Sequence, residues 1–222
     1  MPLIEALIDK DDTSELVRDK VAEILLAESA SQMALAVTAA KDPALWKLRV
    51  FLERTSPWEE WRDAGDSPDL SPIVSVSIDT LNYDAGKSDV IKRQHCSASI
   101  NIDCYGVGVS TETDDGHDPG DLKAALESQR AVKLVRNILM SANYTYLDMR
   151  GLVGKRWLQN VQWMQVDIDA QAVGHVRVGR FILNVDFNEF SPQFAGVPLA
   201  AVSAGVRRRS TGELYFTAEF GA

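Results

Sequence analysis

The chain has 222 residues, of which 45% are hydrophobic and 25% charged, and a formal net charge of −9. This composition is typical of a globular protein with one substantial core. The acidic balance argues against a surface that grips nucleic acid, because phosphate binding needs concentrated Lys and Arg. No apolar run approaches the roughly 20 residues of a membrane span, and acids within the first apolar patch are untypical of a secretory signal. We therefore expect a protein made and kept in a reducing cytoplasm, away from membranes.

Residues 1–70 are expected to form an N-terminal extension with a long helix, a strand and a short helical turn. The helix is predicted to begin at Asp12 or Thr13 and to end before Pro43, and alternating apolar residues predict a strand over 46–52. In the helical turn, Trp58 and Trp61 are three residues apart and share a face. Such a pair usually belongs to a core, and the alternative is a contact with a neighbouring subunit.

A turn-rich stretch, residues 65–72, is predicted to separate this extension from an α+β core over residues 71–192. The order expected in the core is a strand (73–81), a turn (82–89), a strand (95–108), an acidic loop (111–121), a helix capped by Asp118, and two strands within 156–169 and 176–190. Residues 193–222 are predicted to form a hairpin arm that turns at 210–212 and contacts another subunit. The expected fold is a mixed, mainly antiparallel sheet with two main helices packed on it.

Both cysteines lie in the second predicted strand of the core. Small or apolar residues alternate there with polar ones, so the two thiols share the apolar face (Cys96, Ala98, Ile100, Ile102 and Cys104 against Ser97, Ser99, Asn101 and Asp103). Residues eight apart in a strand are separated by about 26 Å, whereas a disulfide needs Cα atoms within about 7 Å. The cysteines therefore cannot bridge or share a metal ion, and we predict that both are buried.

No segment of the sequence has the residue spacing of the enzyme and cofactor motifs that we compared with it. The Gly-Val-Gly at 106–108 precedes a loop and not a helix, the Gly-Lys at 154–155 lacks the phosphate-loop context, and no nucleophile elbow occurs. The three histidines lack metal-ligand spacing, and the acidic loop containing Asp114 and Asp115 lacks the order of a calcium loop. We predict no catalytic group, no metal and no cofactor, and a protein that is not an enzyme.

Several segments together resemble the tail-terminator (tail-completion) proteins of long-tailed bacteriophages. These are IVSVSIDTLNYD, SASINIDCYG, an acidic loop, ALESQRAVKLVRNILMS and GRFILNVDFNEFSP, within residues 73–192. The resemblance lies in the order of elements and the pattern of side chains.

The resemblance implies a wedge-shaped virion protein that forms a ring, expected to be a hexamer, at the head-proximal end of the tail. The ring would stop polymerisation of the tail tube, contact the tube protein, a neck or head-completion protein and possibly a sheath protein, and let DNA pass through its lumen. Assembly would take place in the host cytoplasm. The alternatives are another neck or head-completion protein and, from a different class, a small ligand-binding domain or enzyme.

A ring needs two different patches on each subunit. The candidates are the tryptophan pair, the basic run Arg207, Arg208 and Arg209, and the acidic loop with Asp114 and Asp115. We hypothesise that the arginines of one subunit meet acidic residues of the next.

Overall fold

The computed structural model describes residues 11–62, 69–89, 93–113, 116–166, 174–190, 201–207 and 214–221. The chain divides into two compact units, residues 8–191 and a second unit that combines residues 1–7 with 192–222. The larger unit contains the helices α1 (Thr13–Thr38), α2 (Glu59–Arg62) and α3 (Gly120–Leu139), the 3-10 turns η1 (Pro43–Trp46) and η2 (Ala142–Tyr144), and the strands β1 (Arg49–Leu52), β2 (Ile73–Asp89), β3 (Arg93–Gly108), β4 (Thr111–Thr113), β5 (Gly116–Asp118), β6 (Val153–Gln165) and β7 (His175–Phe190). The smaller unit contains the antiparallel pair β8 (Ala201–Arg207) and β9 (Leu214–Gly221), and the predicted turn at 210–212 lies outside the described residues.

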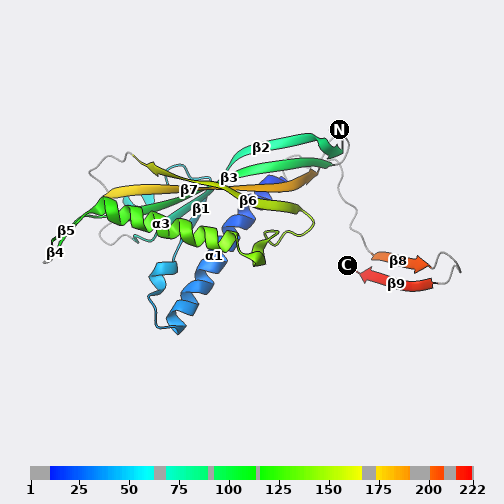
Figure 1. Ribbon diagram of the computed structural model, residues 1–222, viewed down its shortest axis with the longest axis horizontal. Helices are drawn as coiled ribbons and strands as arrows, with labels where there is room; N and C mark the ends of the chain where they lie inside the picture. The colour runs from blue at the N-terminus through cyan, green and yellow to red at the C-terminus, as the bar shows by residue number, and fades with distance from the viewer. Residues whose placement is uncertain are drawn as a thin grey trace, which may run out of the picture. The chain divides into compact units, whose positions relative to one another are not determined.

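One five-stranded sheet organises the larger unit, with the strand order β1-β2-β3-β7-β6 (Figure 1). The strand β1 is parallel to β2, and every other neighbouring pair is antiparallel. The fold is therefore α+β with a mixed, mainly antiparallel sheet, which confirms that part of the prediction. The strands β4 and β5 form a separate small hairpin.

Both long helices pack on the same face of the sheet, which we call the covered face. Buried apolar side chains of α1 and α3 meet those of the strands in one core cluster, whose sheet members include Val74, Val76, Cys96, Ile100, Ile102, Phe181, Leu183 and Phe187. The helix α3 runs along the sheet, and α1 crosses at an angle to α3 (Figure 1). Glycines of β3 permit the close approach of α3, because a Cβ atom on Gly106 would lie 2.4 Å from the carbonyl oxygen of Ala124.

The helix α1 begins where the sequence predicts, because Asp12 and Glu15 close its first turn. The Glu15 carboxylate accepts the N–H of Asp12 at 3.1 Å. By length and composition alone α1 could also cross a membrane, although core helices satisfy the same criteria. Here Val17, Val21 and Leu25 on α1 are fully buried in the domain core.

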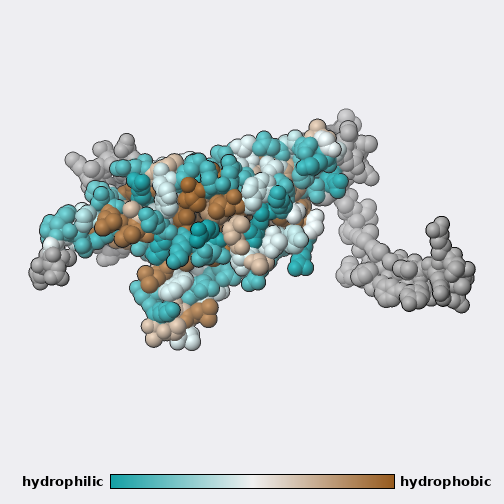
Figure 2. Space-filling model, viewed as in Figure 1, coloured by the Kyte–Doolittle hydropathy of each residue, from teal (hydrophilic) through white to brown (hydrophobic). Residues whose placement is uncertain are grey.

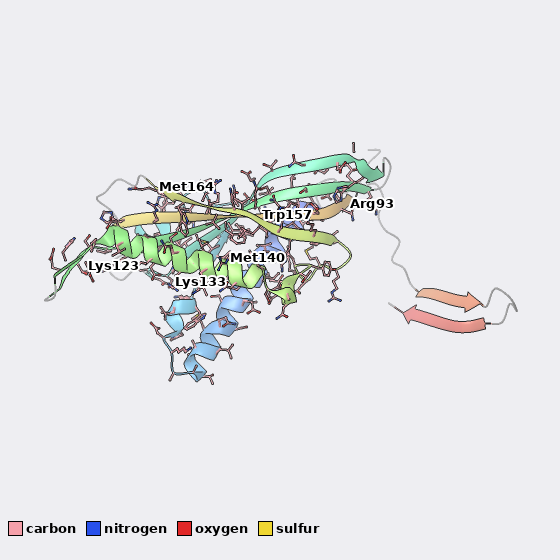
Figure 3. All side chains as sticks on the ribbon, viewed as in Figure 1. Arg93, Lys123, Lys133, Met140, Trp157 and Met164 are labelled. Carbon is pink, nitrogen blue, oxygen red and sulfur yellow. The ribbon has the colours of Figure 1, made fainter. Side chains whose placement is uncertain are left out.

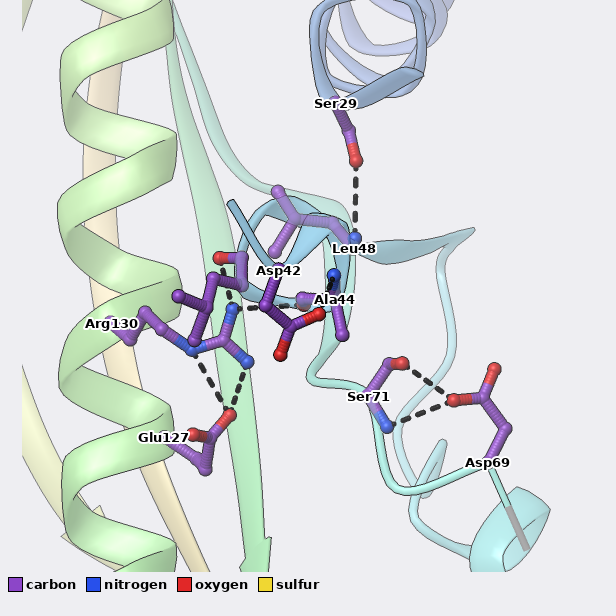
Figure 4. Close-up of polar contacts among 9 residues, drawn as sticks. Ser29, Asp42, Ala44, Leu48, Asp69, Ser71, Glu127 and Arg130 are labelled. Atoms are coloured by element: carbon purple, nitrogen blue, oxygen red, sulfur yellow. Dashed lines mark hydrogen bonds and ion pairs between the residues drawn. The ribbon is translucent and has the colours of Figure 1, made fainter. Parts of the chain in front are cut away.

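The segment around η1 is held between the two helices by polar contacts (Figure 4). The hydroxyl of Ser29 on α1 accepts the N–H of Leu48 at 3.1 Å. On α3, Arg130 donates to the carbonyl oxygen of Leu45 and pairs with Glu127. These contacts place β1 at the edge of the sheet, beside β2.

Four predictions about local structure are corrected. Residues 82–89 belong to β2 and not to a separate turn: residues 82–84 and Asp89 pair with β3, and residues 85–88 form an irregularity between them. Within the acidic stretch, β4 and β5 form a hairpin where a loop is predicted. The helix α3 begins at Gly120, whose N–H donates to the hydroxyl of Ser110 at 3.0 Å, so Asp118 is not its cap. The stretch 65–72 divides no domains, since α1 and β1 belong to the same compact unit as the core.

Candidate functional site: the open face of the sheet

The sheet has a second face that the long helices leave uncovered, and we call its central part the open polar face. It carries side chains from β2, β3 and β7 that alternate with the buried apolar ones: Ser77, Asp79, Ser97, Ser99, Asn101, Asp103, Arg180, Ile182, Asn184 and Asp186. Half of these are small neutral polar residues, three are aspartates, and the others are Arg180 and Ile182. Figure 3 shows how side chains project from the strands and labels Trp157 and Met164 on the edge strand β6.

An ion pair between neighbouring strands lies at the centre of this face. Arg180 on β7 is opposite Asp103 on β3 and donates to both carboxylate oxygens, with distances of 2.7 and 2.8 Å. The hydrogen bond to Asp103 raises the pKa of the Arg180 guanidinium despite partial burial. Burial and the neighbouring Asp103 charge also raise the pKa of Tyr105. The two charges of the pair cancel, so the centre of the face is close to neutral.

Amide side chains extend this polar network across the sheet. Asn101 donates to the carboxylate of Asp79 at 3.1 Å, and Asn184 donates to the side-chain oxygen of Gln159 at 2.9 Å. Lys155 on β6 is directly opposite Asp186 on β7. The face thus offers neutral hydrogen-bonding groups and few uncompensated charges, and it lacks the concentrated Lys and Arg that bind phosphates.

One end of this side of the sheet is closed by Trp61 of α2 and by Trp58, which precedes that helix. Trp61 is 2% exposed and lies in a cluster with Ile73, Tyr105, Val107, Val176 and Val178. Trp58 is half-buried, and its ring centroid is 5.4 Å from that of Tyr105. Trp61 is therefore a core residue, which corrects its proposed role in a subunit contact: its own chain already covers the side chain.

The other predicted contact residues lie beyond what the structure describes. Arg207 ends β8 opposite Leu214, but its side chain is outside the described set, and Arg208 and Arg209 are outside the described residues. Asp114 and Asp115 fall between β4 and β5, also outside the described residues. Their proposed contacts remain predictions.

The two cysteines are free and buried, as predicted. They lie on the covered face, and burial raises the pKa of the Cys96 thiol to about 11 and raises that of Cys104 as well. Both thiols are therefore neutral at physiological pH and behave as small apolar groups.

A cleft of about 590 Å³ lies between the start of α3 and the paired ends of β6 and β7. It is lined by Asp121, Leu122, Ala125, Gln165, His175 and Arg177, among others. Within the described part of the chain, no three His, Cys, Asp or Glu side chains come together as a metal site requires.

Apolar side chains are exposed on the C-terminal half of α1, which projects from the sheet together with η1 (Figures 1 and 2). Leu35 and Val37 on α1 and Leu45 on η1 are 60%, 64% and 47% exposed. A second pair, Leu122 and Leu126, lies at the beginning of α3. Leu122 and Leu126 lie on neighbouring turns of one helix, and exposed apolar side chains that adjoin in this way are typical of surfaces that contact other proteins.

The sequence patterns do not single out Arg180 or its partner Asp103. The sequence does contain one indication of them, the alternation of polar and apolar residues along each strand. Asp103 and Arg180 both occupy polar positions of that alternation, and the apolar positions face the core. What brings them together is the pairing of β3 with β7, and the two residues are 77 positions apart in the chain.

A scan against protein-family models finds no match, and a search among curated proteins finds none either.

Proposed function

We propose that this chain is a virion structural protein that forms a ring at the head-proximal end of a bacteriophage tail. The ring ends polymerisation of the tail tube, and of the sheath where one exists, and joins the tail to a neck or head-completion protein. The proposal rests on the resemblance of residues 73–192 to tail terminators. The observation that supports it best is the two-sided sheet, with helices on one face and a nearly neutral polar surface on the other.

A ring through which DNA passes needs an inner surface that is wetted but does not hold phosphates. Hydroxyl and amide side chains, such as Ser99 and Asn184, meet that requirement. The positive charge of Arg180 is neutralised by Asp103, to which it donates hydrogen bonds. We therefore assign the open polar face to the lumen and the helices to the outside of the ring. The acidic net charge of the chain has the same sign as DNA and opposes binding.

Contact with neighbouring proteins is assigned to surfaces outside the lumen. The exposed apolar end of α1 is one candidate surface for the tube or neck protein. The arginine run at 207–209 and the acidic residues Asp114 and Asp115 are candidates for contacts between subunits. Replacement of all three arginines by Ala is expected to weaken the ring, and an unchanged ring mass would contradict that contact.

The function is tested by tail length. Particles produced without this protein are expected to show overlong tails without heads, because nothing stops tube polymerisation. Tails of normal length that fail to join heads would support the alternative of a neck or head-completion protein. Normal infectious particles would contradict both assignments.

A further inference from the structure

We infer that the copies join edge to edge, with β6 of one copy pairing with the free part of β2 in the next copy. The inference rests on the proposed ring and names the surface that builds it. The strand β6 is one edge of the five-stranded sheet, and β2 forms the other edge beyond the end of the short strand β1, where no described strand pairs with its outer side. Such edges readily accept another strand.

The strand β2 has a free edge beyond the end of β1, and β6 has a free edge along its outer side. On β2, β1 covers only Ile73–Val76, and the Glu53 carboxylate accepts the N–H of Ile78 at 3.1 Å. The strand then continues to Asp89 without an outer neighbour among the described residues. On the other side, β6 runs for 13 residues with β7 as its neighbour on one side alone within the described chain.

Strand direction supports this pairing. The pairs β2–β3, β3–β7 and β7–β6 are all antiparallel, so β2 and β6 run in opposite directions within one copy. Rotation about an axis close to the strand direction preserves each strand's direction. In a ring with such an axis, β6 of one copy therefore meets β2 of the next in antiparallel orientation, and the same face of every sheet points inward.

The side-chain pattern selects one register. Both strands have an irregularity that breaks their alternation, between Ile78 and Thr80 in β2 and between Leu158 and Asn160 in β6. As a result the apolar residues of the covered face are three apart in both places: Ile78 and Leu81 on β2, and Leu158 and Val161 on β6. With Leu158 opposite Leu81, the two irregularities lie side by side and Val161 falls opposite Ile78. The contact ends there, because Glu53 already bonds Ile78 and β1 covers β2 from Val76 back to Ile73.

The same register keeps the two faces of the sheet continuous across the joint. Arg156 then lies opposite Tyr83 on the covered face, and Trp157 lies opposite Asn82 on the polar face. Lys155 lies opposite Asp84. A slip by one residue would instead place apolar side chains against polar ones along the whole contact.

Charge complementarity favours a second copy as the occupant of these edges. The strand β6 carries Lys155 and Arg156 and no acidic residue. The free part of β2 carries three aspartates and a single lysine, Lys87. Because the two edges differ in sign, β6 with β2 is favoured over either edge with itself. Such a contact is heterologous, and repetition of it closes a ring.

Disulfide trapping in the full-length chain tests the register. Directly opposed residues have Cα atoms about 4.5–5.5 Å apart, within the range of a disulfide. The double variant Asn82→Cys with Trp157→Cys is expected to give, on mild oxidation, a ladder of linked chains up to the ring size. Each single variant should stay unlinked, and a mixture of the two single variants should give linked pairs alone.

The matched control is Asn82→Cys with Gln162→Cys. Gln162 is on the same strand and face as Trp157 but about 16 Å further along, so no ladder is expected. A second pair, Leu81→Cys with Leu158→Cys, tests the same register from the covered face. The native mass of every variant is measured first, under reducing conditions.

The outcomes separate the two levels of the proposal. A ring-sized mass without a ladder from either test pair overturns the edge pairing and leaves the ring intact. A disulfide-linked dimer from a single variant overturns it too, since it would show two like edges together. A monomeric mass of the unmodified protein contradicts the ring itself.

Discussion

The two faces of the sheet are built from the same strands and differ in what covers them. On one face, α1 and α3 bury a continuous apolar cluster that includes Ile100 and Phe181. On the other face, Trp61 of the short helix α2 and the preceding Trp58 close one end, and most of the rest is polar. The chain buries the apolar face of its sheet under its own helices and leaves most of the polar face without a helix over it. Such an arrangement suits a subunit that lines a water-filled channel. The difference between the faces can be measured by matched substitutions.

Phe181 and Ile182 are neighbours on β7 that point to opposite faces, so they give the largest contrast. Phe181 is fully buried in the core, and Phe181→Ala is expected to lower the free energy of unfolding by about 3–5 kcal/mol. Ile182 is half-buried on the open face, and Ile182→Ala should cost about 1 kcal/mol. Chemical denaturation measures both, and equal losses would contradict the assignment of the faces.

Gly106 tests the close packing of α3 on the covered face. A Cβ at this position would lie 2.4 Å from backbone atoms of Ala124 and Ser128, so Gly106→Ala should destabilise the protein by about 1–3 kcal/mol. Gly154 on the edge strand is the control, because its nearest neighbour would be 3.7 Å away. Thermal melting of both variants checks this, and a neutral Gly106→Ala would show that α3 is less closely packed than described.

The Asp103–Arg180 pair tests the polar face. Its side chains are 11% and 30% exposed, so the pair is partly shielded from water. Asp103→Asn leaves Arg180 without its carboxylate and is expected to cost about 1–2 kcal/mol. The exposed pair Lys20–Glu23 is the control, and Glu23→Gln should cost less than about 0.5 kcal/mol. If denaturant titration gives the two variants the same stability, the central pair contributes no more than a surface pair.

The cysteines give the smallest effect, on stability at high pH. Burial, with a smaller contribution from the Glu189 charge, raises the pKa of Cys96 from 9.0 to about 11. The resulting stability is fully present below pH 9 and is lost as the pH rises through 11. Cys96→Ala should reduce this loss. Thiol titration of the native protein at pH 8 should be slow at both cysteines, and rapid modification would contradict their burial.

Local patterns in the sequence predict the elements that depend on local physics. The alternation from Cys96 to Cys104 correctly predicts both the strand and the burial of the thiols. The first turn of α1 follows from Asp12 and Glu15. By contrast, Asn82, Tyr83 and Asp84 belong to a segment with the composition of a turn, and pairing with β3 makes them part of a strand. Long-range pairing overrides local preference there.

The site is less predictable than the fold because its residues meet through strand order. Asp103 and Arg180 come together only when β3 lies beside β7. The same limit applies to Trp61, since the spacing shared with Trp58 fits both a core and an interface. Contact with Ile73 and Val178 in the folded chain decides for the core.

The native mass of the purified full-length chain is the most direct test of whether the copies form a closed ring. One chain has a mass of 24.5 kDa. We expect one closed species at a fixed multiple of that mass. Its mass should stay the same over a wide range of protein concentration, because a ring has no free edge to extend. A stable monomer at all concentrations, or an open series of oligomers that lengthens with concentration, would contradict it.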